Sequence, residues 1–146
     1  MQIIDEIKKS AEEVEQTVGY KLNNGLARLE DEEAACKDPY WAYMFARWVK
    51  GANIEKCQEV ACKVPHWAYR FALNVKGANI EKCQEAVCTR PYWAYLFAKY
   101  ISRANMEKCC EAACKDPEWA YEFAQYIKGE NRERCRKACE GTEYAF

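Results

Sequence analysis

The chain has 146 residues, half of them hydrophobic, and its 22 basic and 23 acidic residues leave a net charge of −1. This length corresponds to one domain, and the balanced charge argues against a nucleic-acid-binding protein, which needs a basic face for the phosphates. No apolar run approaches the roughly 20 residues that span a membrane, and the first nine residues lack the apolar region of a secretion signal.

Residues 1–36 differ from the rest of the chain, and we expect them to form N-terminal capping helices. Apolar residues at helical spacing predict an amphipathic helix over residues 3–18: Ile3, Ile4, Ile7, Val14 and Val18. Gly19 and the turn-forming residues 23–25 are expected to break it. Residues 26–36 align with the second helix of the later repeats, but they have Asp31 where those repeats have their first cysteine.

A motif of the form Pro-x-Trp-Ala-Tyr-x-Phe-Ala recurs every 26 residues, beginning at Pro39, Pro65, Pro91 and Pro117. A fixed period of this size predicts a solenoid, in which each repeat buries its apolar face against its neighbours. We therefore divide residues 37–141 into four full repeats, 39–64, 65–90, 91–116 and 117–141. Residues 142–146 are a truncated repeat.

Each repeat is predicted to contain two antiparallel helices, A and B, which makes the fold all-α. Asp38 is a suitable N-cap and Pro39 a suitable first residue for helix A. Gly51 is expected to end helix A, and Asn53 is expected to cap helix B. The next proline ends helix B near Cys62. Helices of about ten residues are unstable alone in water, so stacking must stabilise them.

Eight of the ten cysteines follow the repeat period. Two cysteines five residues apart on helix B are separated by about 140° around the helix and about 7.5 Å along it, which is too far for a disulfide. The second cysteine of one repeat is instead predicted to bond to the first cysteine of the next. The resulting inter-repeat disulfide ladder is Cys36–Cys57, Cys62–Cys83, Cys88–Cys109 and Cys114–Cys135. Asp31 favours this ladder, because a first cysteine there would have no upstream partner.

Cys110 and Cys139 lie outside the predicted ladder. They could pair with each other as a terminal Cys110–Cys139 staple. Alternatively, Cys110, Cys114, Cys135 and Cys139 form two i,i+4 pairs, and four thiolates so placed could hold a tetrahedral Zn²⁺. A third interpretation is that all ten cysteines are reduced and serve as small core residues. The sequence otherwise predicts no cofactor.

Positions that differ between the repeats define a candidate binding face. The motif's own Trp, Ala, Tyr, Phe and Ala never change, and we expect them in the core. Four other positions of helix A vary and share one face, and they include residue types that are common at protein interfaces. The candidate partner-binding residues are Tyr40, Met44, Trp48, Arg70, Leu73, Tyr92, Leu96 and Tyr100. The alternative is a solvated face that varies freely, which fits the glutamates of the last repeat.

Catalysis has little support in the sequence. His66 is the only histidine and lies on the variable face, and no motif places a partner for it. The phosphate-binding loop, the H-E-x-x-H motif and the G-x-S-x-G motif are all absent from the sequence. We therefore expect no catalytic residues.

The repeated motif, followed by Gly-Ala-Asn-Ile-Glu-Lys-Cys, resembles the short αα-solenoid class of Sel1-like and tetratricopeptide repeats. It is closer in length to uncharacterised 26-residue repeats built on Asp-Pro-x-x-Ala-Tyr-x-Tyr-Ala, and its cysteines are similar in arrangement to those of secreted cysteine-rich Sel1-like proteins. The resemblance covers about residues 36–141 and implies an adaptor or scaffold. It transfers no binding residues, because the consensus positions of those families do not map onto this shorter repeat. The near-identity of the repeats is typical of recent duplication or deliberate design.

We therefore expect a disulfide-stabilised scaffold that binds a protein or peptide partner through the variable face of the A helices. The alternatives are a cysteine-rich Zn or Cu protein that uses reduced thiols, and a structural or designed repeat protein without a ligand. A disulfide ladder would indicate an extracytoplasmic or secreted location, or the disulfide-rich cytoplasm of a thermophile.

Overall fold

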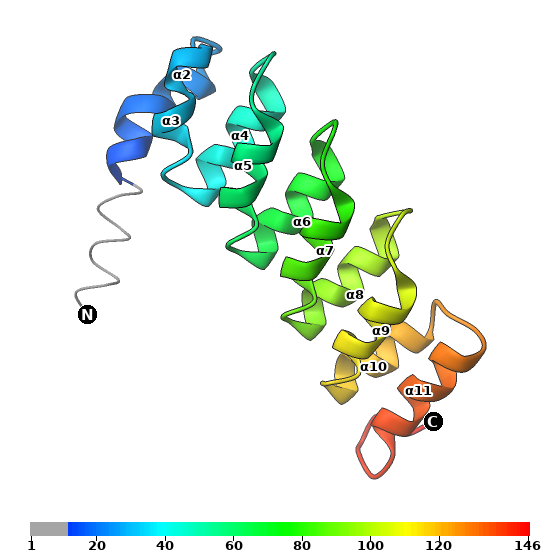
Figure 1. Cartoon of the computed structure of the whole chain (residues 1–146). Helices are drawn as coiled ribbons and strands as arrows, with labels where there is room; N and C mark the ends of the chain where they lie inside the picture. Colours follow the sequence, from blue (N-terminus) through cyan, green and yellow to red (C-terminus); the bar gives the residue numbers. More distant parts are fainter. Residues whose placement is uncertain (1–11) are drawn as a thin grey trace. The chain divides into compact units, whose positions relative to one another are not determined.

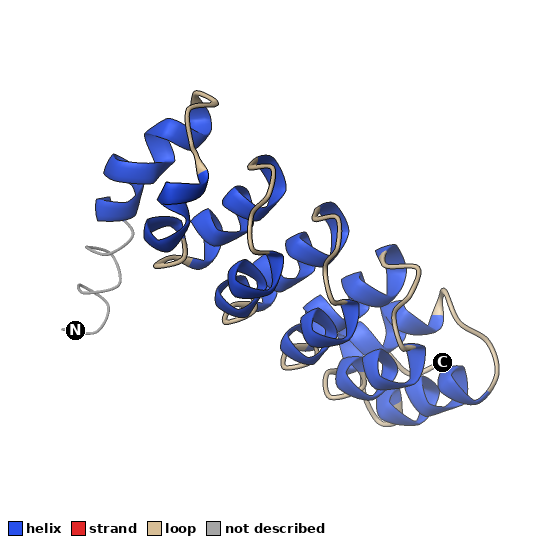
Figure 2. Cartoon of the chain, turned by 45° about the horizontal axis from the view of Figure 1, so that its top comes forward, coloured by secondary structure: helices blue, strands red, loops and turns tan. Residues whose placement is uncertain are grey.

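The computed structural model describes residues 12–146, and this part of the chain contains helices and loops without strands (Figures 1 and 2). The predicted all-α class is therefore confirmed for these residues. Ile3, Ile4 and Ile7 of the predicted N-terminal helix lie outside the described residues. The chain divides into two compact units, Met1–Asn79 and Ile80–Phe146, which we call the first and second units.

The first unit begins with short helical segments and continues with longer helices. The short segments are the π-helix η1 (Glu15–Gly19), α2 (Tyr20–Asn23), the 3-10 helix η2 (Leu29–Asp31) and α3 (Glu32–Ala35). The longer helices are α4 (Pro39–Trp48), α5 (Ile54–Ala61) and α6 (Pro65–Asn74). Helix α4 lies at the centre of this unit, because it contacts α3, α5 and α6.

The second unit consists of α7 (Ile80–Val87), α8 (Pro91–Tyr100), α9 (Met106–Ala113), α10 (Pro117–Ala124) and α11 (Glu130–Cys139). Each of α8 and α10 is followed by a loop and a returning helix, so that α8 packs on α9 and α10 on α11 (Figure 1). Helix α8 also contacts α10, and α9 contacts α11. The A helices α8 and α10 are therefore neighbours within this unit, and so are the B helices α9 and α11.

The helix boundaries follow local signals in the sequence. The Asp38 carboxylate accepts a hydrogen bond from the Trp41 N–H at 3.1 Å, and the Asn53 side chain accepts one from the Lys56 N–H at 3.1 Å. These two predicted N-caps are therefore confirmed. Gly51 has a φ of +85°, which favours glycine, but it lies beyond the end of α4 at Trp48. Helix A therefore ends before this turn and not at its glycine.

The core follows the invariant positions of the motif. Phe45, Phe71, Phe97 and Phe123 are buried, and so are the alanines three residues before them, Ala42, Ala68, Ala94 and Ala120. The invariant tryptophans are less uniform, since Trp41 is buried whereas Trp67, Trp93 and Trp119 are half-buried. The phenylalanine of each repeat is thus the most deeply buried of its three invariant aromatic side chains.

Gly19 does not break the N-terminal helix, so this prediction was wrong. The chain stays helical through Gly19, whose φ is −58°, and continues into α2. A β-carbon at this position would lie 2.7 Å from the Trp41 ring. Gly19 therefore allows the close approach of the Trp41 indole rather than a change of chain direction.

Asp31, which replaces a first cysteine, is a buried hydrogen-bonding residue. Its carboxylate accepts hydrogen bonds from the Arg28 N–H and the Lys21 ammonium, both at 2.9 Å. The bond from the Arg28 N–H, helped by Lys21, lowers the pKa of this carboxyl. Asp31 thus stabilises the start of η2 as an anion.

Replacing Asp31 with alanine should therefore destabilise the protein by about 1 kcal/mol at neutral pH. A carboxyl whose pKa is lower in the folded state stabilises it above the unfolded pKa of about 3.9, and this stabilisation is lost as the pH falls through the folded pKa. Urea unfolding of the native protein and Asp31→Ala across pH should therefore show a constant difference in the free energy of unfolding above about pH 5. This difference should shrink in acid. A difference that grows in acid would contradict this role.

Candidate functional site

The structure brings together thiols from neighbouring repeats at the predicted 21-residue separation. The Sγ atoms of Cys36 and Cys57 are 3.7 Å apart, and those of Cys114 and Cys135 are 3.5 Å apart. These distances are thiol contacts, because the sulfurs of a disulfide are about 2.05 Å apart. The disulfide ladder itself therefore stays a prediction.

Contact between two thiols shifts their pKa values in opposite directions. The hydrogen bond between Cys36 and Cys57 lowers the pKa of Cys36 and raises that of Cys57. The hydrogen bond between Cys88 and Cys109 likewise lowers the pKa of Cys88 and raises that of Cys109. In each pair, the half-buried thiol is thus the first to ionise, and the thiolate is the form that attacks disulfides and binds metals.

The second unit contains a group of three thiols, which we call the thiol cluster: Cys110, Cys114 and Cys135. Cys135 Sγ lies 3.5 Å from both Cys110 Sγ and Cys114 Sγ, and the last two are 3.8 Å apart. Hydrogen bonds from Cys114 and Cys135 lower the pKa of Cys110 to about 4. The bond to Cys110 raises the pKa of Cys114 to about 12 and also raises that of Cys135. The cluster therefore holds one thiolate readily at neutral pH.

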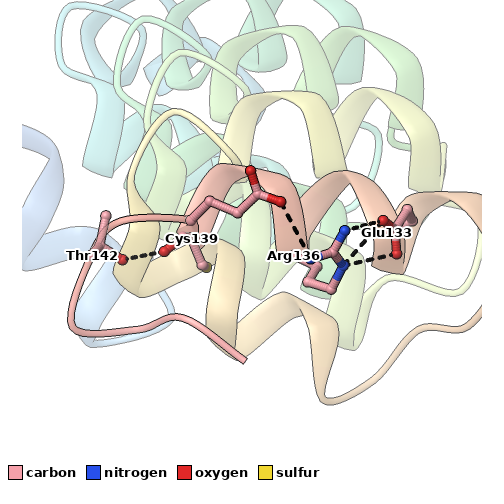
Figure 3. A network of polar contacts seen from close by, with 5 residues as sticks. Glu133, Arg136, Cys139 and Thr142 are labelled. Carbon is pink, nitrogen blue, oxygen red and sulfur yellow. Dashed lines mark hydrogen bonds and ion pairs between the residues drawn. The ribbon is translucent and has the colours of Figure 1, made fainter.

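The structure gives Cys139 different partners from those predicted. Its thiol donates a hydrogen bond to the Pro117 carbonyl at 3.3 Å, and its own carbonyl accepts one from the Thr142 hydroxyl at 2.6 Å (Figure 3). Neighbouring Arg136 is paired with Glu133. Of the four cysteines of the possible zinc site, three therefore converge, while Cys110 contacts Cys114 and Cys135 rather than a staple partner.

Two buried glutamines, which the sequence analysis did not identify, bind the backbone 21 residues further along. The Gln58 side chain accepts a hydrogen bond from the Asn79 N–H at 2.8 Å and donates one to the Asn79 carbonyl at 3.0 Å. Gln84 Oε1 accepts a hydrogen bond from the Asn105 N–H at 2.6 Å. The identical recurrence of glutamine beside the first cysteine was the signal for this role. Cys110 occupies the same position one repeat later.

Several variable positions of the A helices are exposed in both units. In the first unit, Trp48 is 61% exposed, whereas Trp41 on the same helix is 6% exposed. In the second unit, Tyr100 is 54% exposed and Tyr126 is similar. Leu73 and Arg70 are also exposed, whereas Met44 and Leu96 are half-buried. The variable face is thus largely accessible.

Tyr40 and Tyr92 belong partly to the packing between repeats. The Tyr40 ring lies 4.8 Å from the Trp67 ring in the first unit, and the Tyr92 ring lies 4.9 Å from the Trp119 ring in the second. Tyr43 also stacks on Trp67 at 5.7 Å. Trp67 and Trp119 are therefore covered by tyrosines of the preceding repeat, and Tyr40 is half-buried itself.

Cations lie over the exposed rings of the variable face. The Arg47 guanidinium is 4.7 Å from the Trp48 ring centre. Lys99 Nζ is 4.6 Å from the Tyr126 ring and 5.3 Å from the Tyr100 ring. The crevice between Tyr95, Lys99 and Tyr126 has a free volume of about 10 Å³, which is room for about one water molecule. It is too small for a cofactor-sized ligand.

His66 is stacked on Trp67, with ring centres 4.3 Å apart. Burial, together with the charge of Arg70, lowers the pKa of His66.

Within the described residues, no helix is long and apolar enough to cross a membrane. The chain matches no family model, no curated protein and no solved structure.

Proposed function

We propose that this protein is a helical repeat scaffold that binds a protein or peptide partner through the variable face of its A helices. The observation that carries the proposal is the contrast between Trp41 and Trp48 on α4. The invariant tryptophan is buried, whereas the variable one is exposed. A large aromatic side chain gains no stability from exposure, and aromatic residues dominate the binding energy of protein interfaces.

The second unit repeats this contrast on α8. Phe97 is buried, whereas Tyr100, three residues later, is exposed beside Lys99. The absence of room in the crevice beside Lys99 favours a partner that lies across the face over one that enters a pocket. The cations over the exposed rings favour partner segments in which apolar residues alternate with Asp or Glu.

The scaffold would consist of the four 26-residue repeats, stiffened by the disulfide ladder and related to the Sel1-like and tetratricopeptide class. The thiol contacts Cys36–Cys57 and Cys114–Cys135 support two of its rungs. Cys88–Cys109 is supported by the interaction of its thiols, which lowers the pKa of Cys88 and raises that of Cys109. Cys62–Cys83 follows from the repeat register in the sequence. Each rung closes a loop of about 22 residues, which fixes the A helices that present the binding face.

Selection of peptides from a displayed random library tests this proposal. Peptides that bind the native protein should contain an aromatic or aliphatic residue near Asp or Glu. The double variant Trp48→Ala/Tyr100→Ala, which removes one exposed ring from each unit, should weaken their binding at least tenfold. Its melting temperature should stay within a few degrees of that of the native protein, because both rings are exposed.

Tyr20→Ala is the matched control, because Tyr20 is an equally exposed aromatic residue outside the A helices. Tyr20→Ala and His66→Ala should both retain peptide binding. Selected peptides that bind the double variant as tightly as the native protein would contradict the proposed face. Loss of binding with His66→Ala alone would transfer the site to the His66 edge of α6.

A further inference from the structure

The thiol cluster departs from the repeat pattern at one buried position. At the corresponding position of the preceding repeat, the Gln84 side chain accepts a hydrogen bond from the Asn105 N–H. It also lies 3.8 Å from the Cys109 sulfur. Cys110 lies 3.5 Å from the Cys135 sulfur in the same register. Its thiol contacts the Asn131 carbonyl at 3.4 Å. The third repeat therefore has a third thiol in place of a backbone-binding amide.

The presence of Cys110 in place of a glutamine replaces a strong neutral hydrogen bond with a weaker thiol contact in the interior. A thiol is a weak donor and a weak acceptor, whereas a glutamine amide can satisfy both backbone groups of the next helix. The change is therefore unfavourable for the scaffold alone. What it adds is a group of three sulfurs on α9, on its C-cap residue Cys114 and on the packed helix α11. Within residues 12–146 no other three Cys, His, Asp or Glu side chains converge in this way.

The three sulfurs have the separations of a metal–thiolate site. Their distances of 3.5, 3.5 and 3.8 Å define a triangle whose centre is about 2.1 Å from each sulfur. An ion with metal–sulfur bonds of about 2.3 Å would lie about 1 Å out of this plane. An ion there could bind all three thiolates without a change of backbone, because two of its ligands are on one helix turn.

We propose that Cys110, Cys114 and Cys135, when reduced, bind one soft d¹⁰ cation, Zn²⁺ or Cu⁺. Thiolates select such ions over Mg²⁺ and Ca²⁺, which prefer oxygen ligands. With Zn²⁺, three thiolates leave a net charge of −1, and Arg134 lies close enough to favour the Cys110 thiolate. The fourth position of a tetrahedral ion stays open, because the Cys139 thiol is engaged with Pro117.

This site and the last rung of the ladder exclude each other. A disulfide between Cys114 and Cys135 would remove two of the three ligands, so metal binding requires the reduced form. The other rung of this unit, Cys88–Cys109, holds two thiols, and two thiolates alone bind Zn²⁺ much more weakly than three. The proposal therefore predicts one Zn²⁺ ion and not one per repeat.

Titration of the anaerobically reduced protein with Co²⁺ tests the site, because cobalt bound to thiolates gives intense sulfur-to-metal charge-transfer bands. We expect saturation at one equivalent and displacement of Co²⁺ by one equivalent of Zn²⁺. A parallel titration with Cu⁺, buffered by a chromophoric chelator, identifies which of the two ions binds more tightly. Failure of all three ions to bind at micromolar concentration would overturn the proposal.

The repeats provide a matched pair of variants. Cys110→Gln restores the residue found at positions 58 and 84, so it should keep the helicity of the native protein and weaken metal binding at least 100-fold. Gln84→Cys places a third thiol beside Cys88 and Cys109, and the reduced variant should bind a second equivalent. Unchanged one-equivalent binding by Cys110→Gln would overturn the assignment, as would a failure of Gln84→Cys to bind more than the native protein.

Discussion

Phe97→Ala is expected to lower the free energy of unfolding by about 3–5 kcal/mol, which is the usual cost of truncating a buried aromatic side chain. Phe97 has no exposed surface, and it lies on α8, which contacts α7, α9 and α10. The cavity left by the ring would therefore weaken the packing of several helices in the second unit. Urea unfolding followed by the helical signal in circular dichroism, with reductant present, measures this change without a contribution from disulfides.

Tyr100→Ala on the same helix is the control for Phe97→Ala. Its side chain is largely exposed, so its truncation should cost less than about 1 kcal/mol. A ratio of at least three between the two changes would confirm that α8 has one buried and one accessible aromatic face. Equal costs would show that Tyr100 contributes to the core and would remove the main argument for the binding face.

The sequence was sufficient to predict the helices and their core stripe. Asp38, Asn53 and the repeated prolines are local signals, because each acts on backbone groups within a few residues. The buried phenylalanines and alanines followed from their invariance among the repeats. These features depend on contacts that recur in every repeat, so the same residue type is found at the same position several times in one sequence.

The sequence was not sufficient where a residue's role depends on a partner in the next repeat. Tyr40 varies between repeats, which indicated a solvent-facing position, yet it covers the Trp67 ring. The role of Gln58 was not predicted, because its side chain binds the Asn79 backbone, 21 residues further along the chain. Glycine predicts a helix break from local sequence, whereas the reason for Gly19 is the ring of Trp41, which is 22 residues away in the sequence.

The thiol cluster shows the same limit at the candidate site. Residue spacing placed Cys110 and Cys114 on one face of a helix and did so equally for Cys135 and Cys139. It could not show that helix α11 turns Cys135 towards Cys110, whereas the Cys139 thiol meets the Pro117 carbonyl. Distances between helices depend on how the helices pack, and they cannot be predicted from the spacing of residues within one helix.

Removal of one rung of the disulfide ladder should lower the stability of the oxidised protein by about 3 kcal/mol, because the lost crosslink closes a loop of about 22 residues in the unfolded chain. The rung Cys88–Cys109 is the best test, since it lies within the second unit and outside the thiol cluster. The double variant Cys88→Ser/Cys109→Ala keeps the half-buried position polar and the buried position apolar. Unfolding by guanidinium of both proteins, oxidised and reduced, measures the effect.

The free energies of unfolding of the native protein and the double variant should differ by about 3 kcal/mol when both proteins are oxidised. The difference should fall below about 1 kcal/mol when both are reduced, because a disulfide restricts the unfolded chain only when it is formed. Peptide mapping without reductant should recover Cys88 linked to Cys109, and Cys36 linked to Cys57, whose thiols already touch at 3.7 Å. Recovery of Cys57 linked to Cys62, or of Cys83 linked to Cys88, would contradict the ladder. Those pairs are five residues apart on one helix, and their disulfides would require helix B to unwind.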